Sequence, residues 1–277
     1  MTATVDHGEN IRSNKPRDLR WVALSAVIPT ATLVPLVILC PALPFPGVNL
    51  NGQVYLDFVL PNHTGEMQAL LIAAHAVSVF LFFLLLAAAY RRRSGDTATA
   101  RSLMTGAMGC FLAMWAVVAS IYLQIPLIGR GYPSFGSYPQ DLKLITLCWN
   151  TANAILAFSA APLVLAFGAV MFANRSCPLL PKFFGKWGAL AVIVVNAGSL
   201  GCVFVYKGPW SVGAFFQFLV PMGFAYVWML IVALALLRVQ GAGVPTRWTW
   251  RGRVGVRGVT GSDQRRPGGG SRPGARG

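Results

Sequence analysis

Six stretches of the chain contain no Asp, Glu, Lys or Arg and are long enough to cross a lipid bilayer. They are Trp21–Cys40, Met67–Tyr90, Ser102–Gly129, Leu144–Asn174, Trp187–Tyr206 and Gly208–Leu237. A hydrocarbon core of about 30 Å is crossed by about 20 apolar residues in a helix. Each stretch must be helical, because a backbone in lipid has no water with which to hydrogen-bond. The sequence therefore predicts an all-α fold, a bundle of six transmembrane helices.

The composition excludes an ordinary soluble enzyme. Of the 277 residues, 55% are hydrophobic and 11% are charged, whereas a soluble domain carries about 25% charged residues. The chain has 8 acidic residues against 23 basic ones. Such a chain also offers few carboxylates for acid–base or di-metal chemistry.

The basic residues predict the direction of the bundle. Of the 23 Lys and Arg residues, 20 lie in the two terminal segments and in the second and fourth connections, while the other connections hold Arg130, Lys143 and Lys207. Cytoplasmic loops of membrane proteins are enriched in Lys and Arg. We therefore expect both termini in the cytoplasm and the protein in a bacterial plasma membrane.

The flanking segments differ from the six-helix domain at residues 21–238. Residues 1–20 are polar and form a predicted cytoplasmic terminus. Residues 239–277 contain 11 glycines and 8 arginines, a composition that predicts a disordered cytoplasmic tail. The tail either binds anionic lipid or nucleic acid loosely by its charge, or is an extension without function, read past an ancestral stop codon or out of frame. We expect no specific nucleic-acid partner, because Trp248 and Trp250 are its only aromatic residues.

The first outer connection, residues 41–66, is long and rich in proline. Its apolar residues predict that it lies on the membrane surface or caps the bundle. They are Phe45, Val54, Tyr55, Leu56 and Val59.

Five polar residues within the spans are candidate ligand-binding residues: His75, Asn150, Asn153, Asn196 and Gln217. Polar side chains in hydrocarbon face the bundle interior and find partners there. One hypothesis is a shared polar cluster in the outer half of the bundle, forming a pocket for a small molecule. The alternative is that these side chains hydrogen-bond to neighbouring helices without binding a ligand.

The sequence predicts neither a metal site nor a cofactor. Bis-imidazole haem ligation needs two intramembrane histidines, and His75 is the one histidine in the spans. The five cysteines form no Cys-x-x-Cys pair, so we expect free thiols, with a Cys40–Cys148 or Cys148–Cys202 disulfide as the alternative. The spans lack the charged groups that ion-driven transporters place in the membrane.

Two segments resemble a bacterial family of uncharacterised six-helix membrane proteins. The first is Arg175-Ser176-Cys177-Pro178-Leu179-Leu180-Pro181, followed by Gly185 and an apolar span; the second is the helix Pro221-Met222-Gly223-Phe224-Ala225-Tyr226-Val227-Trp228. The resemblance covers residues 65–240, and the first outer connection is longer than the family's. It implies a six-helix fold in a bacterial membrane and carries over no catalytic residues.

These observations predict a multi-pass membrane protein without catalytic machinery. We expect an accessory subunit, or a protein that binds or passes a small molecule, whose partners are the lipid bilayer and another membrane protein or a second copy. The alternative is a membrane enzyme acting on a lipid-phase substrate, with His75 as its base.

Overall fold

The computed structural model describes residues 17–38, 50–92, 97–130, 142–205, 210–212 and 215–241, and within these ranges every element is a helix. The all-α prediction is thus confirmed for the described residues. The elements are α1 (Arg17–Ile38), α2 (Gly52–Val59), η1 (Pro61–His63), α3 (Thr64–Arg91), α4 (Ala98–Gly129), α5 (Leu142–Phe158), α6 (Ala160–Ser176), η3 (Phe183–Gly188), α7 (Ala189–Gly201), η4 (Cys202–Phe204) and α8 (Phe215–Gly241).

Among the described residues, five helical segments are long and apolar enough to cross a membrane. They are Thr64–Arg91, Ala98–Gly129, Leu142–Ser176, Phe183–Phe204 and Leu219–Arg238. They correspond to the second to sixth predicted spans. The predicted first span overlaps α1, a helix of 22 residues, and its last two residues lie outside the described ranges.

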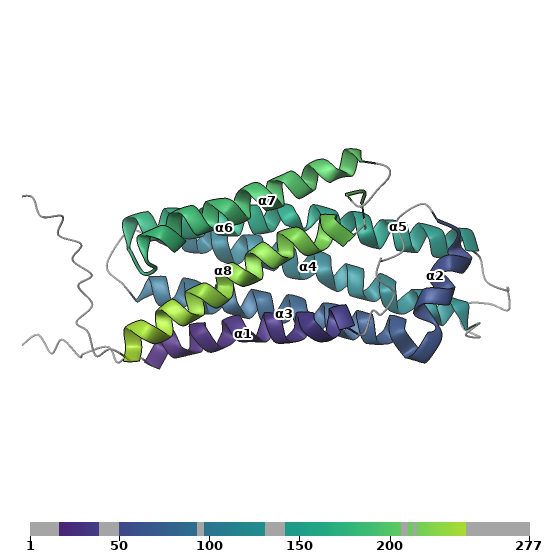
Figure 1. Cartoon of the computed structure of the whole chain (residues 1–277), viewed down its shortest axis with the longest axis horizontal. Coiled ribbons are helices and arrows are strands. Elements are labelled where there is room, and N and C mark those ends of the chain that lie inside the picture. The colour runs from purple at the N-terminus through teal and green to yellow at the C-terminus, as the bar shows by residue number, and fades with distance from the viewer. Residues whose placement is uncertain are drawn as a thin grey trace, which may run out of the picture. The chain divides into compact units, whose positions relative to one another are not determined.

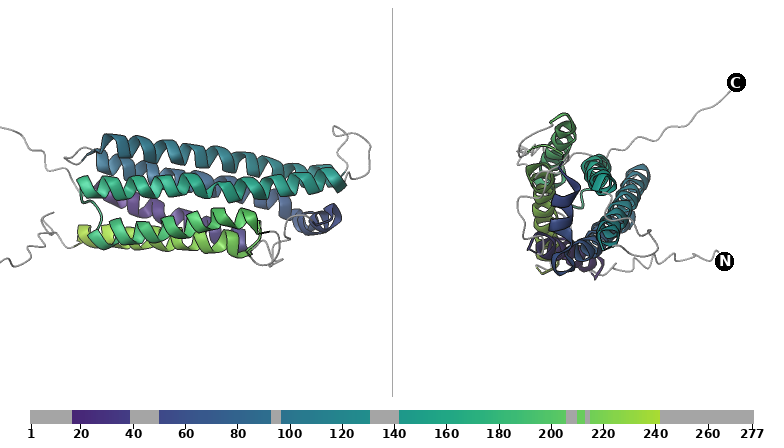
Figure 2. Two further views of the ribbon diagram at one scale, coloured as in Figure 1. Left: turned by 90° about the horizontal axis from the view of Figure 1, so that it is seen from above. Right: turned by 90° about the vertical axis from the view of Figure 1, so that its right-hand side faces the viewer.

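The long helices contact one another in a closed order (Figure 1). Each of α1, α3, α4, α6, α7 and α8 contacts the next, and α8 closes the order against α1. In this order each helix runs opposite to the one before it, whereas α5 continues into α6 in the same direction. Figure 2 shows the helices side by side from two further sides. Large aromatic side chains fill the interior: Phe83 of α3 lies 5.4 Å from Phe167 of α6, and Phe167 lies 4.9 Å from Trp228 of α8, between ring centroids. This packing buries the interior faces of the bundle.

The fourth span is broken into two helices at Ser159. The Ser159 amide donates to the carbonyls of both Ile155 (2.9 Å) and Leu156 (3.2 Å), a shared bond typical of a locally tightened turn. Pro162 follows three residues later and has no N–H to donate to Phe158. Together the two helices form the single candidate membrane-crossing segment Leu142–Ser176, which corresponds to the predicted fourth span, and the missing N–H of Pro162 explains the turn between them.

The structure also moves two predicted boundaries. The prediction placed residues 1–20 in a polar terminus, but α1 already begins at Arg17. Similarly, α8 continues to Gly241, three residues into the predicted tail. Helices exceed the apolar stretch because backbone hydrogen bonds continue into the interface beyond the hydrocarbon. Residues 242–277 lie outside the described ranges.

Candidate functional site

The helix α2 caps the ends of α3, α4 and α5. Asn51 accepts a hydrogen bond from the Gln53 amide at 3.1 Å and so begins the helix. Tyr55, Leu56 and Val59 are fully buried. A Cβ atom on Gly52 would lie 2.2 Å from the carbonyl oxygen of Leu142. The backbone of α2 therefore packs directly against the backbone of α5, and only glycine fits at this position. Of the two predicted placements, on the membrane surface or over the end of the bundle, the structure shows the second for these three residues. Val54 is exposed, and Phe45 lies outside the described ranges.

An aromatic group around Trp149 joins this cap to the bundle. The Tyr55 ring stacks on Trp149 with centroids 4.6 Å apart, and Phe58 and Tyr122 lie 5.7 Å and 5.2 Å from it. The Tyr55 hydroxyl accepts from the Leu50 amide at 2.9 Å and donates to Asn150 at 3.5 Å. Burial raises the pKa of the Tyr55 phenol, which keeps it protonated and able to donate.

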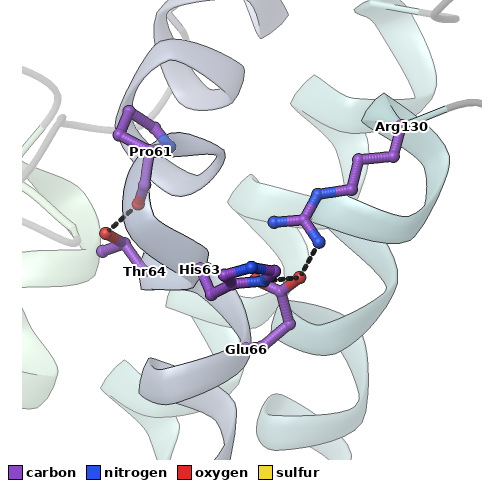
Figure 3. Close-up of polar contacts among 5 residues, drawn as sticks. All are labelled: Pro61, His63, Thr64, Glu66 and Arg130. Atoms are coloured by element: carbon purple, nitrogen blue, oxygen red, sulfur yellow. Dashed lines mark hydrogen bonds and ion pairs between the residues drawn. The ribbon is translucent and has the colours of Figure 1, made fainter.

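An ion pair links the start of α3 to the end of α4 at the same end of the bundle. Figure 3 shows Glu66 accepting from Arg130 at 2.7 Å and lying 3.4 Å from the Nδ1 atom of His63. His63 adopts a left-handed backbone conformation with φ of 58°, which lets η1 turn directly into α3. The ion pair thus holds together the two helix ends on which α2 packs.

His75 of α3 is the central polar residue of the bundle, and it is fully buried. Its Nδ1 atom lies 3.0 Å from the hydroxyl of Thr32 on α1, and its Nε2 atom contacts the hydroxyl of Tyr226 on α8. The Trp115 ring of α4 lies 5.2 Å from the imidazole. Four helices therefore meet at this one side chain.

One set of proton positions satisfies the whole group. Thr32 donates its hydroxyl proton to the Pro29 carbonyl at 2.9 Å, so its oxygen accepts from Nδ1–H of His75. The Nε2 lone pair is then left to accept from the Tyr226 hydroxyl. This assignment gives a directed chain of hydrogen bonds from Tyr226 through His75 and Thr32 to the backbone of α1.

Trp115 connects this group to the break in the fourth span. Its indole N–H donates to the Ser159 hydroxyl at 3.0 Å, and that hydroxyl donates to the Leu156 carbonyl at 2.6 Å. The sequence did not predict a role in this group for Thr32, Trp115, Ser159 or Tyr226. Trp115 and Tyr226 could have been found from the sequence, because an indole or phenol within a span needs a hydrogen-bond partner.

The four predicted amide residues are placed in different surroundings. Asn150 contacts Tyr55 under the cap, and Gln217 is buried in α8. Asn153 and Asn196 each donate to a carbonyl of their own helix, at Trp149 and Val192, both at 2.9 Å. His75, Asn153 and Asn196 therefore hydrogen-bond to other groups and not to one another. Ligand binding by the five residues stays a prediction.

The cysteines of the described residues are free thiols: Cys110, Cys148, Cys177 and Cys202. The alternative Cys148–Cys202 disulfide is therefore not formed, and Cys40 lies outside the described ranges. Within those ranges no three His, Cys, Asp or Glu residues are grouped so as to hold a metal ion.

Comparison with known proteins finds no relative. No family model matches the chain, and no curated protein or solved structure matches it either. The resemblance to the bacterial six-helix family therefore rests on the quoted motifs alone.

Proposed function

We propose that this chain is a multi-pass protein of the bacterial plasma membrane that performs no catalysis of its own and serves as an accessory subunit of another membrane protein. The observation that favours this proposal over the enzymatic alternative is the way in which His75 is held. Both of its ring nitrogens have partners on neighbouring helices, and none of its surface is exposed.

A general base must direct a lone pair at a proton of its substrate. In this bundle the lone pair of Nε2 accepts from Tyr226, and Trp115 covers the ring. His75 is therefore better suited to joining α1, α3 and α8 than to attacking a lipid-phase substrate. This arrangement favours the structural interpretation of the histidine over the enzymatic one.

The proposed topology has α1 as a sixth span and both termini in the cytoplasm. A helix of 22 residues is about 33 Å long, and α1 packs along α3 and α8. The ends of the helices support the orientation: Arg91, Arg175 and Arg238 close three helices that run in one direction, whereas Arg130 follows α4, which runs in the other. Because cytoplasmic loops are enriched in Lys and Arg, the end of the bundle that carries these cations is the proposed cytoplasmic end.

One face of α4 is exposed, and its residues support the proposal that another membrane protein binds there. Small residues recur there at spacings of four and three: Ser102, Gly106, Gly109, Ala113, Ala116 and Ser120. A Cβ atom added to Gly106 or Gly109 would have no atom within 4 Å. Gln124, one turn beyond Ser120, presents an exposed amide on the same face. Small residues let two membrane helices approach closely, and an amide adds a hydrogen bond between them.

Photo-cross-linking in native membranes tests this proposal, with a thiol-reactive benzophenone reagent attached to Cys110. Cys110 is exposed and lies one turn from Gly106, so a variant with Ser at the other four cysteines carries one probe beside the face. We expect a cross-linked product that contains another membrane protein. Gly106→Leu should abolish it, whereas Gly198→Leu on α7, at a glycine that is equally open, should leave it unchanged.

The remaining outcomes separate the alternatives. A product that contains two copies of this chain would show a homo-oligomer and overturn the accessory role. No product would refute partner binding through α4. A lipid-modifying activity that is lost in His75→Ala would establish the enzyme in place of the accessory subunit.

A further inference from the structure

Asn174, at the end of α6, is the point where three segments of the chain meet. Its Oδ1 atom accepts from the Tyr90 hydroxyl of α3 at 3.2 Å and from the Leu180 amide at 2.8 Å, and its Nδ2 atom donates to the Leu180 carbonyl at 3.3 Å. A Cβ atom on Gly185 of η3 would lie 2.0 Å from the same Nδ2 atom. The ends of α3 and α6 and the start of η3 are thus held together around one amide.

Each of these segments carries a cation beside its contact residue. Arg91 follows Tyr90, Arg175 follows Asn174, Lys182 lies two residues after Leu180, and Lys186 follows Gly185. All four side chains are exposed. Asn174 therefore gathers four cations at one end of the bundle, although they are spread over almost a hundred residues of sequence.

The protein does not neutralise these charges among its described residues. The ion pair described in those ranges joins Glu66 to Arg130 at the other end of the bundle, where Glu66 also lies 3.4 Å from His63. The sequence contains no Asp or Glu between residues 142 and 262, and Asp96, which follows α3, lies outside the described ranges. Four exposed cations thus face their surroundings without a described carboxylate partner.

Two exposed aromatic side chains lie among the cations. Phe183 is 64% exposed and Trp187 is 54% exposed, and the ammonium group of Lys186 lies 4.8 Å from the centroid of the Trp187 ring. Aromatic rings next to Lys at the end of a span are typical of the level of the lipid headgroups. The backbone of this segment is held in place by Trp228, whose indole donates to the Phe184 carbonyl at 2.9 Å.

We propose that this basic surface, formed by Arg91, Arg175, Lys182, Phe183, Lys186 and Trp187, binds the headgroups of anionic phospholipids. The cations bind the phosphates, and Phe183 and Trp187 lie beside them at the level of the headgroups. Arg presents a planar fork of donors that matches phosphate oxygens, and Lys adds a compact charge. This inference concerns a different surface from the partner face of α4 and does not depend on it.

Lipid binding to the purified full-length chain tests the inference. Phosphatidylglycerol or phosphatidylcholine is titrated into detergent micelles that contain the protein, and bound lipid is counted by native mass spectrometry. We expect a preference for phosphatidylglycerol that weakens with added salt. Removing one cation, as in Lys186→Gln, should lower the apparent affinity for phosphatidylglycerol about fivefold, and Lys182→Gln combined with Lys186→Gln should lower it further.

Matched variants decide the outcome. Lys143→Gln removes an exposed cation at the other end of the bundle and should leave the affinity unchanged, and Lys186→Arg keeps the charge and should retain it. The melting temperature in phosphatidylcholine shows whether each variant is folded. The inference is wrong if the wild type binds both lipids equally, if a folded Lys182→Gln/Lys186→Gln variant binds phosphatidylglycerol as the wild type does, or if Lys143→Gln weakens binding as much as Lys186→Gln.

Discussion

Replacing Tyr226 by Phe removes one hydroxyl from the interior of the bundle and leaves the ring in place. The hydroxyl contacts Nε2 of His75 and lies 3.7 Å from the sulfur of Met222. Because the ring stays, no large cavity forms, and the cost comes from the lost hydrogen bond and from a buried Nε2 atom without a donor. An interhelical hydrogen bond in a membrane protein contributes about 0.6 kcal/mol on average and about 1.7 at most.

The unpaired nitrogen adds to this cost. A buried polar atom that loses its partner costs about 1–3 kcal/mol in soluble proteins, and the smaller values apply where the unfolded state in the membrane also finds partners. We therefore expect Tyr226→Phe to lower the free energy of unfolding by about 1–2 kcal/mol. Thr32→Val, which removes the acceptor of Nδ1–H, should cost a similar amount.

A double-mutant cycle isolates the contact between the two side chains. Unfolding of the wild type, Tyr226→Phe, His75→Ala and the double variant is followed by circular dichroism as sodium dodecyl sulfate is added to mixed micelles. His75→Ala also creates a cavity, but this cost cancels in the cycle. We expect a coupling energy of about 1 kcal/mol. A coupling energy within error of zero, together with an unchanged stability of Tyr226→Phe, would refute the bonded arrangement of His75.

Three further predictions concern the end of the bundle that α2 caps. Gly52→Ala should lower the melting temperature markedly, because its Cβ would lie 2.2 Å from the Leu142 carbonyl oxygen, whereas Gly106→Ala, with no atom within 4 Å, should not. Glu66→Gln should cost less than about 1 kcal/mol of unfolding free energy, and added salt should reduce the difference from the wild type, because the ion pair with Arg130 is partly exposed. Tyr55 has a raised pKa in the folded state, so the protonated phenol contributes stability that is fully present below the unfolded pKa of about 10 and is lost as the pH rises above it. Unfolding titrations above pH 10 should therefore show a smaller loss of stability in Tyr55→Phe than in the wild type; equal losses would contradict this assignment.

The helical class and the position of the apolar segments could be predicted from the sequence because the bilayer imposes them residue by residue. A stretch such as Met67–Tyr90 has to be a helix in lipid whatever its neighbours are, and the structure places α3 there. For a similar reason the sequence predicted that Tyr55, Leu56 and Val59 would cover an apolar surface, but only the structure decided that this surface is the end of the bundle and not the membrane. Boundaries were less accurate, because helices extend past the hydrocarbon at both ends, as at Arg17 and Gly241.

The sequence by itself determined that His75 would need partners, but the tertiary structure alone decided which ones. A polar group in hydrocarbon must be paired, and this is a property of the residue and its solvent. The identity of the pair depends on which faces of α1, α3 and α8 come together, and Thr32, His75 and Tyr226 are separated by 43 and 151 residues along the chain. The same holds for the four cations around Asn174, whose proximity comes from the meeting of three helix ends and from no local pattern of charge.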